Sequence, residues 1–177
     1  MTRTLTLAAM LGLAALTAPP AHAADFDARS PKDVLAVVTT NGASGELTIG
    51  KDGKPTIKGQ AGRIYFDVYF DDCDATKAQC GTLIFTGSWD SRKVTADQIN
   101  RWNRWTLFCP AYLEADSSPD MWYSVAVSAR SGREDVADDV ERWMNCLQDF
   151  DDFVGAPDDF LKRNEPVTPP PAPSSPH

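Results

Sequence analysis

The side chains that could carry chemistry in this chain are four cysteines and many carboxylates, in a sequence with almost no histidine. The chain has 177 residues, including 25 Asp or Glu and only two histidines. His22 lies close to the N-terminus and His177 is the last residue, so the sequence between them contains none. A domain in that stretch cannot use Ser-His-Asp or Cys-His catalytic groups, or zinc sites with histidine ligands.

The four cysteines are spaced for crosslinks rather than for metal binding. Cys73 and Cys80 bracket a short polar loop between two strand-like runs, which leaves Cys109 to pair with Cys146. Neither pair has the close Cys-x-x-Cys spacing of zinc or thioredoxin-like sites. We therefore predict two disulfides, Cys73–Cys80 and Cys109–Cys146, and no metal site. Reduced, buried thiols are the alternative if the chain is not exported.

Carboxylates gather in two stretches of the sequence. The predicted hairpin loop holds Asp71, Asp72 and Asp74. The second stretch lies near the end of the chain and holds Asp149, Asp151, Asp152, Asp158 and Asp159. Neither matches the pattern of a calcium loop, and we expect solvated charged surfaces with no cofactor. A small-ligand or cation sensor at the loop acids is one alternative, and a hydrolase that uses only carboxylates in a cleft is another.

Aromatic side chains offer a better candidate for binding. Residues 64–71 alternate in polarity, which predicts a half-buried strand with Tyr65, Asp67 and Tyr69 on its outer face. Tyrosine and tryptophan dominate protein–protein contacts, so we predict an unknown protein partner at this face. Trp105 is a second candidate, because it falls outside the buried Ile99 and Trp102 stripe of its predicted helix. Packing in the core is the alternative explanation for most of the aromatic residues.

The N-terminal residues are typical of a secretory signal peptide. Arg3 precedes an uncharged apolar run over residues 5–16, and Ala21-His22-Ala23 forms a small-x-small cleavage site. We expect cleavage after Ala23 and a periplasmic or secreted protein, with an uncleaved membrane anchor as the alternative. A second long apolar run is absent, so no membrane span is expected after cleavage. The formal net charge of −8 disfavours a nucleic-acid partner.

Helix signals divide the rest of the chain. Ser30 precedes Pro31 as a cap, and Thr95 begins a second helix with Gln98 as its capping-box partner. A third helix carries apolar residues at steps of three and four, namely Val136, Val140, Trp143, Leu147, Phe150 and Val154. We predict a linker over residues 24–29, a domain over 30–155 and a proline-rich disordered tail over 156–177.

Strand-like runs lie between these helices. The first covers Glu46–Ile49, where Leu47 and Ile49 are expected to point inward. The order helix, strands, helix, strand, helix predicts a single α+β domain with a mostly antiparallel sheet of about five strands and three helices.

The chain resembles the YbjN-domain family, whose members are also labelled bacterial sensory transduction regulators. The resemblance rests on the aromatic strand that ends at Cys73, on Cys80, on the strand TLIFTGSW and on the helix motif Ile99-Asn100-Arg101-Trp102-Asn103. It covers about residues 30–155 and implies an α+β fold similar to type III secretion chaperones, with no established enzyme activity. The second cysteine pair and the proline-rich tail depart from the family pattern and disfavour a cytoplasmic role. We therefore expect an exported, non-enzymatic binding or chaperone-like regulatory module.

Overall fold

A computed structural model describes residues 25–90 and 93–164 of the chain. The predicted signal peptide with its cleavage site, and the proline-rich residues from Glu165 onward, lie outside the described residues. The elements, in chain order, are α1 (Pro31–Thr40), β1 (Ser44–Ile49), β2 (Pro55–Ala61), β3 (Ile64–Cys73), β4 (Cys80–Ser88), α2 (Ala96–Trp105), β5 (Ala111–Leu113), β6 (Pro119–Ala126), α3 (Arg133–Gly155) and α4 (Pro157–Asn164).

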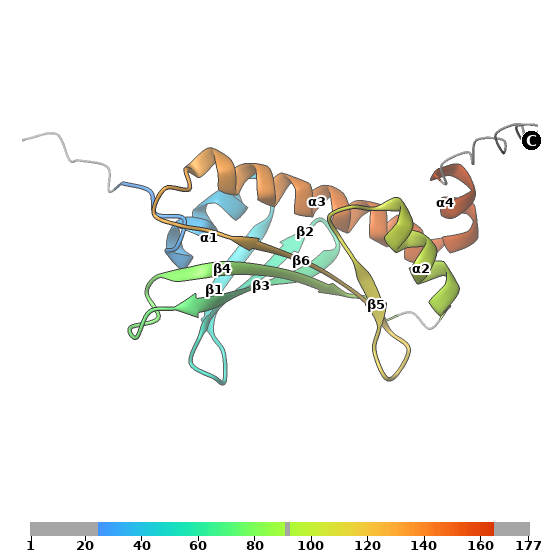
Figure 1. The fold of residues 1–177 in the computed structure, drawn as a ribbon, viewed down its shortest axis with the longest axis horizontal. Coiled ribbons are helices and arrows are strands. Elements are labelled where there is room, and N and C mark those ends of the chain that lie inside the picture. The colour runs from blue at the N-terminus through green and yellow to red at the C-terminus, as the bar shows by residue number, and fades with distance from the viewer. Residues whose placement is uncertain (1–24, 91–92, 165–177) are drawn as a thin grey trace, which may run out of the picture.

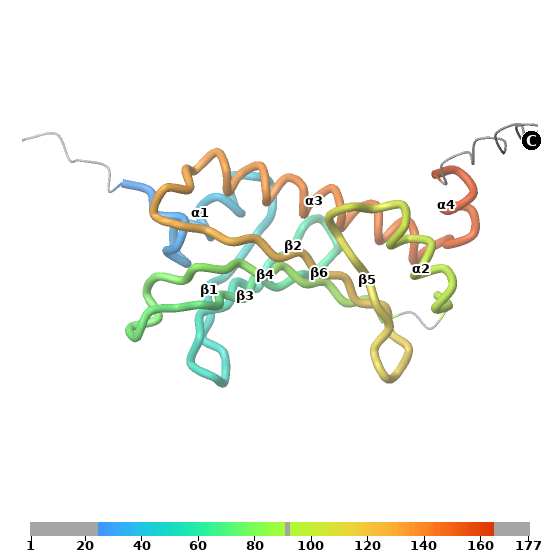
Figure 2. Tube along the Cα trace, viewed as in Figure 1, coloured from blue at the N-terminus to red at the C-terminus, as the bar shows by residue number. Residues whose placement is uncertain are grey.

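The strands form one antiparallel sheet with helices on one of its faces (Figures 1 and 2). Its six strands follow the order β1-β2-β3-β4-β6-β5. The turns that join β1 to β2 and β5 to β6 project on the side away from the helices (Figure 1). The predicted α+β class with a mostly antiparallel sheet is confirmed, with one strand and one helix more than expected in the described residues.

The predicted caps start the first two helices. The Ser30 hydroxyl accepts a hydrogen bond from the backbone N–H of Asp33 at 3.4 Å, with Pro31 at the first helical position. Thr95 and Gln98 exchange bonds between side chain and backbone at 3.3 and 2.8 Å, which completes the capping box of α2.

The long helix α3 supplies the centre of the core. The apolar residues predicted for its inner face are buried, namely Val136, Val140, Trp143, Leu147, Phe150 and Val154. The Trp143 ring lies 6.3 Å from Phe66 on β3 and 5.7 Å from Phe85 on β4, between ring centroids. This helix therefore packs its apolar stripe against the middle strands of the sheet.

Residues 157–164 differ from the sequence-based expectation, because they form α4 instead of belonging to a disordered tail. Pro157 does end α3, but it also stands as the first residue of the next helix, where its missing N–H costs nothing. Phe160 and Leu161 then turn inward, with 4% and 0% of their surface exposed. The folded domain thus extends to at least Asn164.

The extra strand β5 is held in place by side chains of α2 rather than by its own sequence pattern. The indole N–H of Trp102 donates to the carbonyl of Cys109 at 2.9 Å. The Asn103 amide donates to the carbonyl of Ala111 at 2.9 Å, and its oxygen accepts from the Ala111 N–H at 2.8 Å. The motif that carries the family resemblance therefore anchors the segment after α2 against the edge of the sheet.

The prediction that Leu47 and Ile49 are inward-pointing residues is correct for the side of the sheet but wrong for burial. The register places Leu47 opposite the buried Ile57, on the helix side. However, β1 is the edge strand, and Leu47 and Ile49 remain 37% and 69% exposed. An edge position lacks the second neighbour that would cover these side chains.

Candidate functional site

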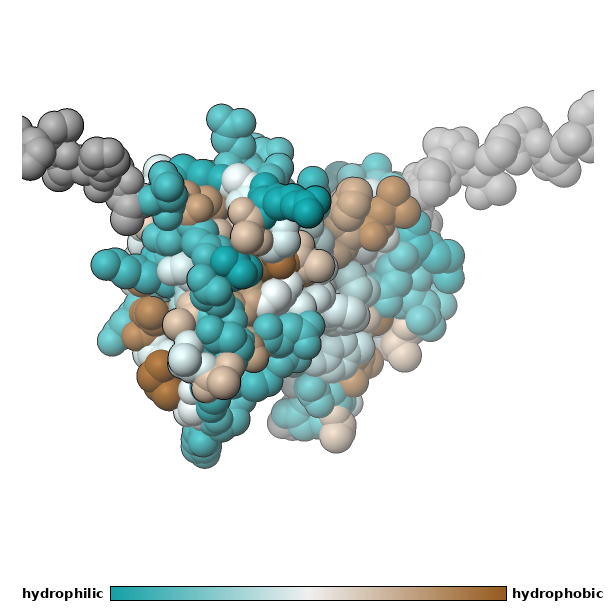
Figure 3. All heavy atoms as spheres, turned by 60° about the vertical axis from the view of Figure 1, so that its left-hand side comes forward, coloured by the Kyte–Doolittle hydropathy of each residue, from teal (hydrophilic) through white to brown (hydrophobic). Residues whose placement is uncertain are grey.

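The face of the sheet opposite the helices, called the open face here, is covered by no described element (Figure 1). Its large exposed aromatic side chains come from three strands. They are Tyr65 at 71%, Tyr69 at 42%, Trp122 at 42% and Tyr112 at 43% exposure. The side of the molecule drawn in Figure 3 is mostly hydrophilic, and its apolar side chains gather in small separate patches.

Strand register brings these side chains into neighbouring rows. Tyr69 lies opposite Thr56 on β2 and Ile84 on β4. Trp122 on β6 lies opposite Thr86, which in turn lies opposite Asp67 on β3. Because adjacent strands are about 4.8 Å apart, the aromatic side chains of β3 and β6 share one surface rather than two.

The predicted residues Tyr65, Asp67 and Tyr69 therefore lie together, and Asp67 is the hydrogen-bond acceptor among them. The Lys58 ammonium donates to Asp67 Oδ2 at 2.6 Å, and the Tyr69 hydroxyl donates to the same oxygen at 2.9 Å. Burial, and then the hydrogen bond to Asp67, raise the pKa of Tyr69, so its phenol is neutral at pH 7. Asp67 thus orients Tyr69 and is neutralised by Lys58.

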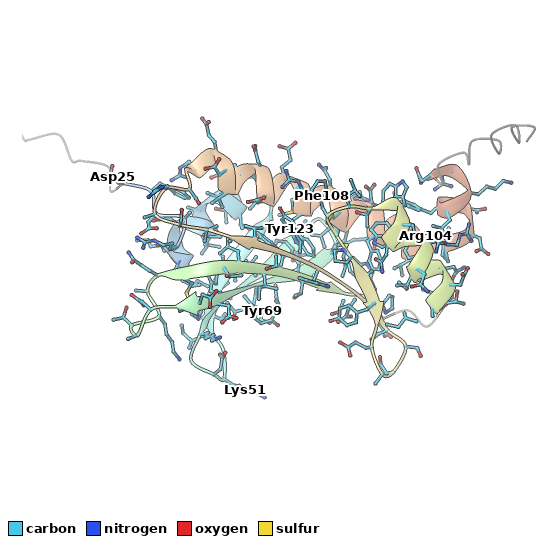
Figure 4. All side chains as sticks on the ribbon, in the orientation of Figure 1. Asp25, Lys51, Tyr69, Arg104, Phe108 and Tyr123 are labelled. Carbon is cyan, nitrogen blue, oxygen red and sulfur yellow. A yellow bond between two sulfur atoms is a disulfide. The ribbon has the colours of Figure 1, made fainter. Side chains whose placement is uncertain are left out.

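A cavity of about 680 Å³ opens beside these side chains, next to the turn between β1 and β2. Thr56, Tyr69 and Ile84 line it on the sheet, and Lys51 lines it from the projecting turn, which lies below Tyr69 in Figure 4. Lys54 donates to Asp71 Oδ1 at 2.5 Å, and this hydrogen bond lowers the pKa of Asp71. The cavity therefore combines the ring of Tyr69 on its floor with a rim on which Lys54 and Asp71 are paired.

The hairpin between β3 and β4 is closed as predicted, by a disulfide between Cys73 and Cys80. Its acids are used in local contacts. Asp74 accepts hydrogen bonds from the Thr76 hydroxyl at 2.9 Å and from the Ala78 N–H at 3.0 Å, and the first of these lowers the pKa of Asp74 most. Among the described residues, no cluster of His, Cys, Asp or Glu side chains is placed to hold a metal ion.

The fourth predicted residue, Trp105, lies elsewhere. Its ring centroid is 5.0 Å from that of Trp102 and 5.1 Å from that of Phe160, on the helix side of the sheet. It lines a second cavity, of about 550 Å³, which we call the helix-side cavity. The structure therefore separates Trp105 from Tyr65 and Tyr69 by the full thickness of the sheet.

The helix-side cavity is bounded by apolar groups and by a polar network. Leu107 and Phe108 are 86% and 53% exposed at its mouth, where Figure 4 shows Phe108 beside α3. The Arg142 guanidinium lies 4.9 Å from the Phe108 ring centroid and donates to Asp139 at 2.8 Å and to the Tyr123 hydroxyl at 2.9 Å. This network fixes one wall of the cavity.

The second predicted disulfide, Cys109–Cys146, forms at this wall and joins the segment after α2 to α3. Asp149 lines the same cavity, and no ion pair with a described residue involves it. Burial, followed by repulsion from Asp152, raises the pKa of Asp149.

Sequence reasoning missed several exposed groups. Trp122 and Tyr112 belong to the open face, and the alternation of Trp122 with the buried Met121 was a usable signal for this. Leu107 and Phe108 follow the end of α2 at Trp105 in a segment without periodicity. No sequence pattern indicated that they would be exposed.

Comparisons with protein-family models, with curated proteins and with solved structures find no match to this chain. The helices in the described part of the chain are all too short or too polar to cross a bilayer. The two disulfides are compatible with an oxidising compartment.

Proposed function

We propose that this chain is a non-enzymatic binding module whose open face contacts a protein partner. The observation that carries the proposal is the set of exposed aromatic side chains on a sheet face that no described helix covers. Water-exposed aromatic rings are costly to keep on a soluble surface, and they are the groups that supply most of the binding energy at interfaces.

The electrostatics of the open face suit a protein ligand better than an ion. Its best-placed charges are engaged with each other, as Lys58 with Asp67 and Lys54 with Asp71. Side chains that are already paired and oriented lose little further freedom on binding, which favours a tyrosine-rich contact surface.

Site-specific photocrosslinking tests the proposal. A photoreactive phenylalanine analogue replaces Tyr65 in one variant and Phe108 in the other, because Phe108 is an exposed aromatic residue on the opposite side. We expect a discrete crosslinked partner from Tyr65 only, lost when Tyr69 and Trp122 are both changed to Ala. Crosslinks of equal yield from both positions would refute the open face as the site.

The helix-side cavity supports a second candidate function, the binding of a small organic cation. Its volume of about 550 Å³ is within the range of small-molecule sites, and it combines the rings of Trp105 and Phe108 with the Asp149 carboxylate. Thermal shift against a panel of amines and quaternary ammonium compounds tests this. Stabilisation should disappear in Asp149→Asn, and stabilisation that survives this change would contradict the assignment.

Export and family membership are part of the proposal. We infer a periplasmic or secreted location from the N-terminal pattern and from the two disulfides. Membership of the YbjN-domain family is supported by the α2 motif and by the one-sided packing of helices on an antiparallel sheet. N-terminal sequencing of the mature protein, with Ala24 expected as its first residue, tests the export step.

A further inference from the structure

The two edges of the sheet differ in whether their outward backbone groups are already hydrogen-bonded. At the β5 edge, the strand has only three residues, and the Asn103 amide binds both the N–H and the carbonyl of Ala111. At the β1 edge, the strand has six residues, and no described strand pairs with its outer side. Its segment Ser44–Ile49 contains neither lysine nor proline, the residues that commonly block an exposed edge.

The bonding pattern identifies which backbone groups of β1 face outward. Gly50 donates its N–H to the carbonyl of Lys54 at 2.8 Å, so these two residues form a hydrogen-bonded pair of the antiparallel ladder. Such pairs alternate along the ladder, which makes Thr48 and Glu46 the next residues bonded to β2. The N–H and carbonyl groups of Gly45, Leu47 and Ile49 therefore point to the free edge.

We propose that the β1 edge pairs with the β1 edge of a second copy of this chain, giving a dimer with one continuous sheet. The outward-facing residues are self-complementary about a two-fold axis at Leu47. An antiparallel partner sets Leu47 opposite the second copy's Leu47, and Gly45 opposite its Ile49. Each of these pairs exchanges two backbone hydrogen bonds, and no outward group between positions 45 and 49 is left over.

The side chains fit the same register. Leu47 and Ile49 lie on the helix side and are 37% and 69% exposed in the single chain, so pairing would cover them further. Ile49 would face Gly45, which has no side chain; a Cβ at position 45 would lie 2.9 Å from Leu35 Cδ1, so the Leu35 side chain would have to shift. On the open face, Glu46 would lie opposite Thr48, so no like charges face each other directly.

Light scattering over a concentration series tests the dimer in the mature protein. We expect a dimer for the wild type and a monomer for Leu47→Lys, which places two ammonium groups opposite each other at the axis. Leu107→Lys is the matched control, because Leu107 is also an exposed leucine but lies at the helix-side cavity. It should leave the dimer intact.

Hydrogen exchange gives a second measurement that does not depend on a variant folding. The amides of Gly45, Leu47 and Ile49 should be protected in the wild type at high concentration and exchange faster on dilution. A wild type that stays monomeric at its highest soluble concentration, or a dimer that leaves these amides unprotected, would overturn the proposal. A dimer that persists in Leu47→Lys would do the same.

Discussion

The helix side and the open face both expose aromatic rings, but they attach them to the fold in different ways. On the helix side, Trp105 packs against Trp102 and, edge to face, against Phe160, and the Arg142 guanidinium lies over the Phe108 ring. On the open face, Tyr65 projects from one strand into solvent, with 71% of its surface exposed. An exposed ring can therefore be either the outermost part of the packed core or a group available to contact a binding partner.

This difference in attachment suggests that the exposed rings of the helix side serve stability and those of the open face serve binding. Side chains of the helix side share contacts with the aromatic cluster of Trp102, Phe150, Phe153 and Phe160. Changes there should weaken folding, whereas changes at the open face should weaken only recognition. Stability measurements on matched variants of the two regions test this division.

Removing a tryptophan should lower stability by very different amounts in the two regions. Trp102→Ala should lower the free energy of unfolding by about 4 kcal/mol, because the ring is fully buried in an aromatic cluster. Trp122→Ala, the control on the open face, should cost less than about 0.5 kcal/mol. Urea unfolding with both disulfides intact measures each value. Equal losses would contradict the division.

The disulfides should also differ. Replacing Cys109 and Cys146 by Ser should cost about 4 kcal/mol, because this bond closes a separation of 37 residues. Replacing Cys73 and Cys80 by Ser should cost about 2.5 kcal/mol, since the separation is only 7. Thermal or urea unfolding of the two double variants gives the order. The reverse order would show that the hairpin disulfide, and not the one on the helix side, contributes more to the free energy of unfolding.

Two tyrosine hydroxyls offer a finer comparison. Tyr123→Phe removes a hydroxyl that donates to Asp139 at 2.6 Å and accepts from Arg142 at 2.9 Å, and should cost about 1.5 kcal/mol. Tyr69→Phe removes a hydroxyl whose one partner in the described part of the chain is Asp67 on the open face, and should cost under about 0.5 kcal/mol. A larger loss for Tyr69→Phe in urea unfolding would show that the open face carries folding energy.

The smallest expected effect concerns Asp120, whose Oδ1 is buried and has no hydrogen-bond partner among the described residues. Burial raises the pKa of Asp120, so the folded state favours its neutral form. Its contribution to stability is present below the ordinary Asp pKa of about 3.9 and is lost as the pH rises through the raised value. Asp120→Asn should therefore raise Tm slightly at pH 7.

Differential scanning calorimetry across pH checks this. The difference in Tm between Asp120→Asn and the wild type should shrink at acidic pH, where the wild-type carboxyl is protonated. A Tm difference that does not change with pH would show that the ionisation of Asp120 is not its cause. Asp149→Asn is a useful companion, since burial also raises the pKa of Asp149 on the helix side.

Local signals in the sequence predicted most of the fold. The caps at Ser30 and Thr95 start their helices as predicted, and the apolar steps from Val136 to Val154 form the buried face of α3. These features depend on neighbours within one or two turns, which a sequence displays directly. The alternation along β3 placed Tyr65 and Tyr69 on the same face for the same reason.

The remaining features depend on contacts that are distant in sequence. β5 exists because Asn103 and Trp102 bind the backbone after α2, and α4 is held by packing of Phe160 on the aromatic cluster. The separation of Trp105 from Tyr65 requires knowing that all helices lie on one face of the sheet. None of these contacts leaves a periodic pattern in the chain.

The amide of Asn103 has a consequence for the size of any assembly. Because it occupies the outward N–H and carbonyl of Ala111, the β5 edge cannot act as a template for another strand at that residue. If a sheet can add strands at just one of its edges, it reaches its final size after a single association. Fibre growth needs two open edges, so this side chain limits edge-to-edge growth to a closed, finite complex.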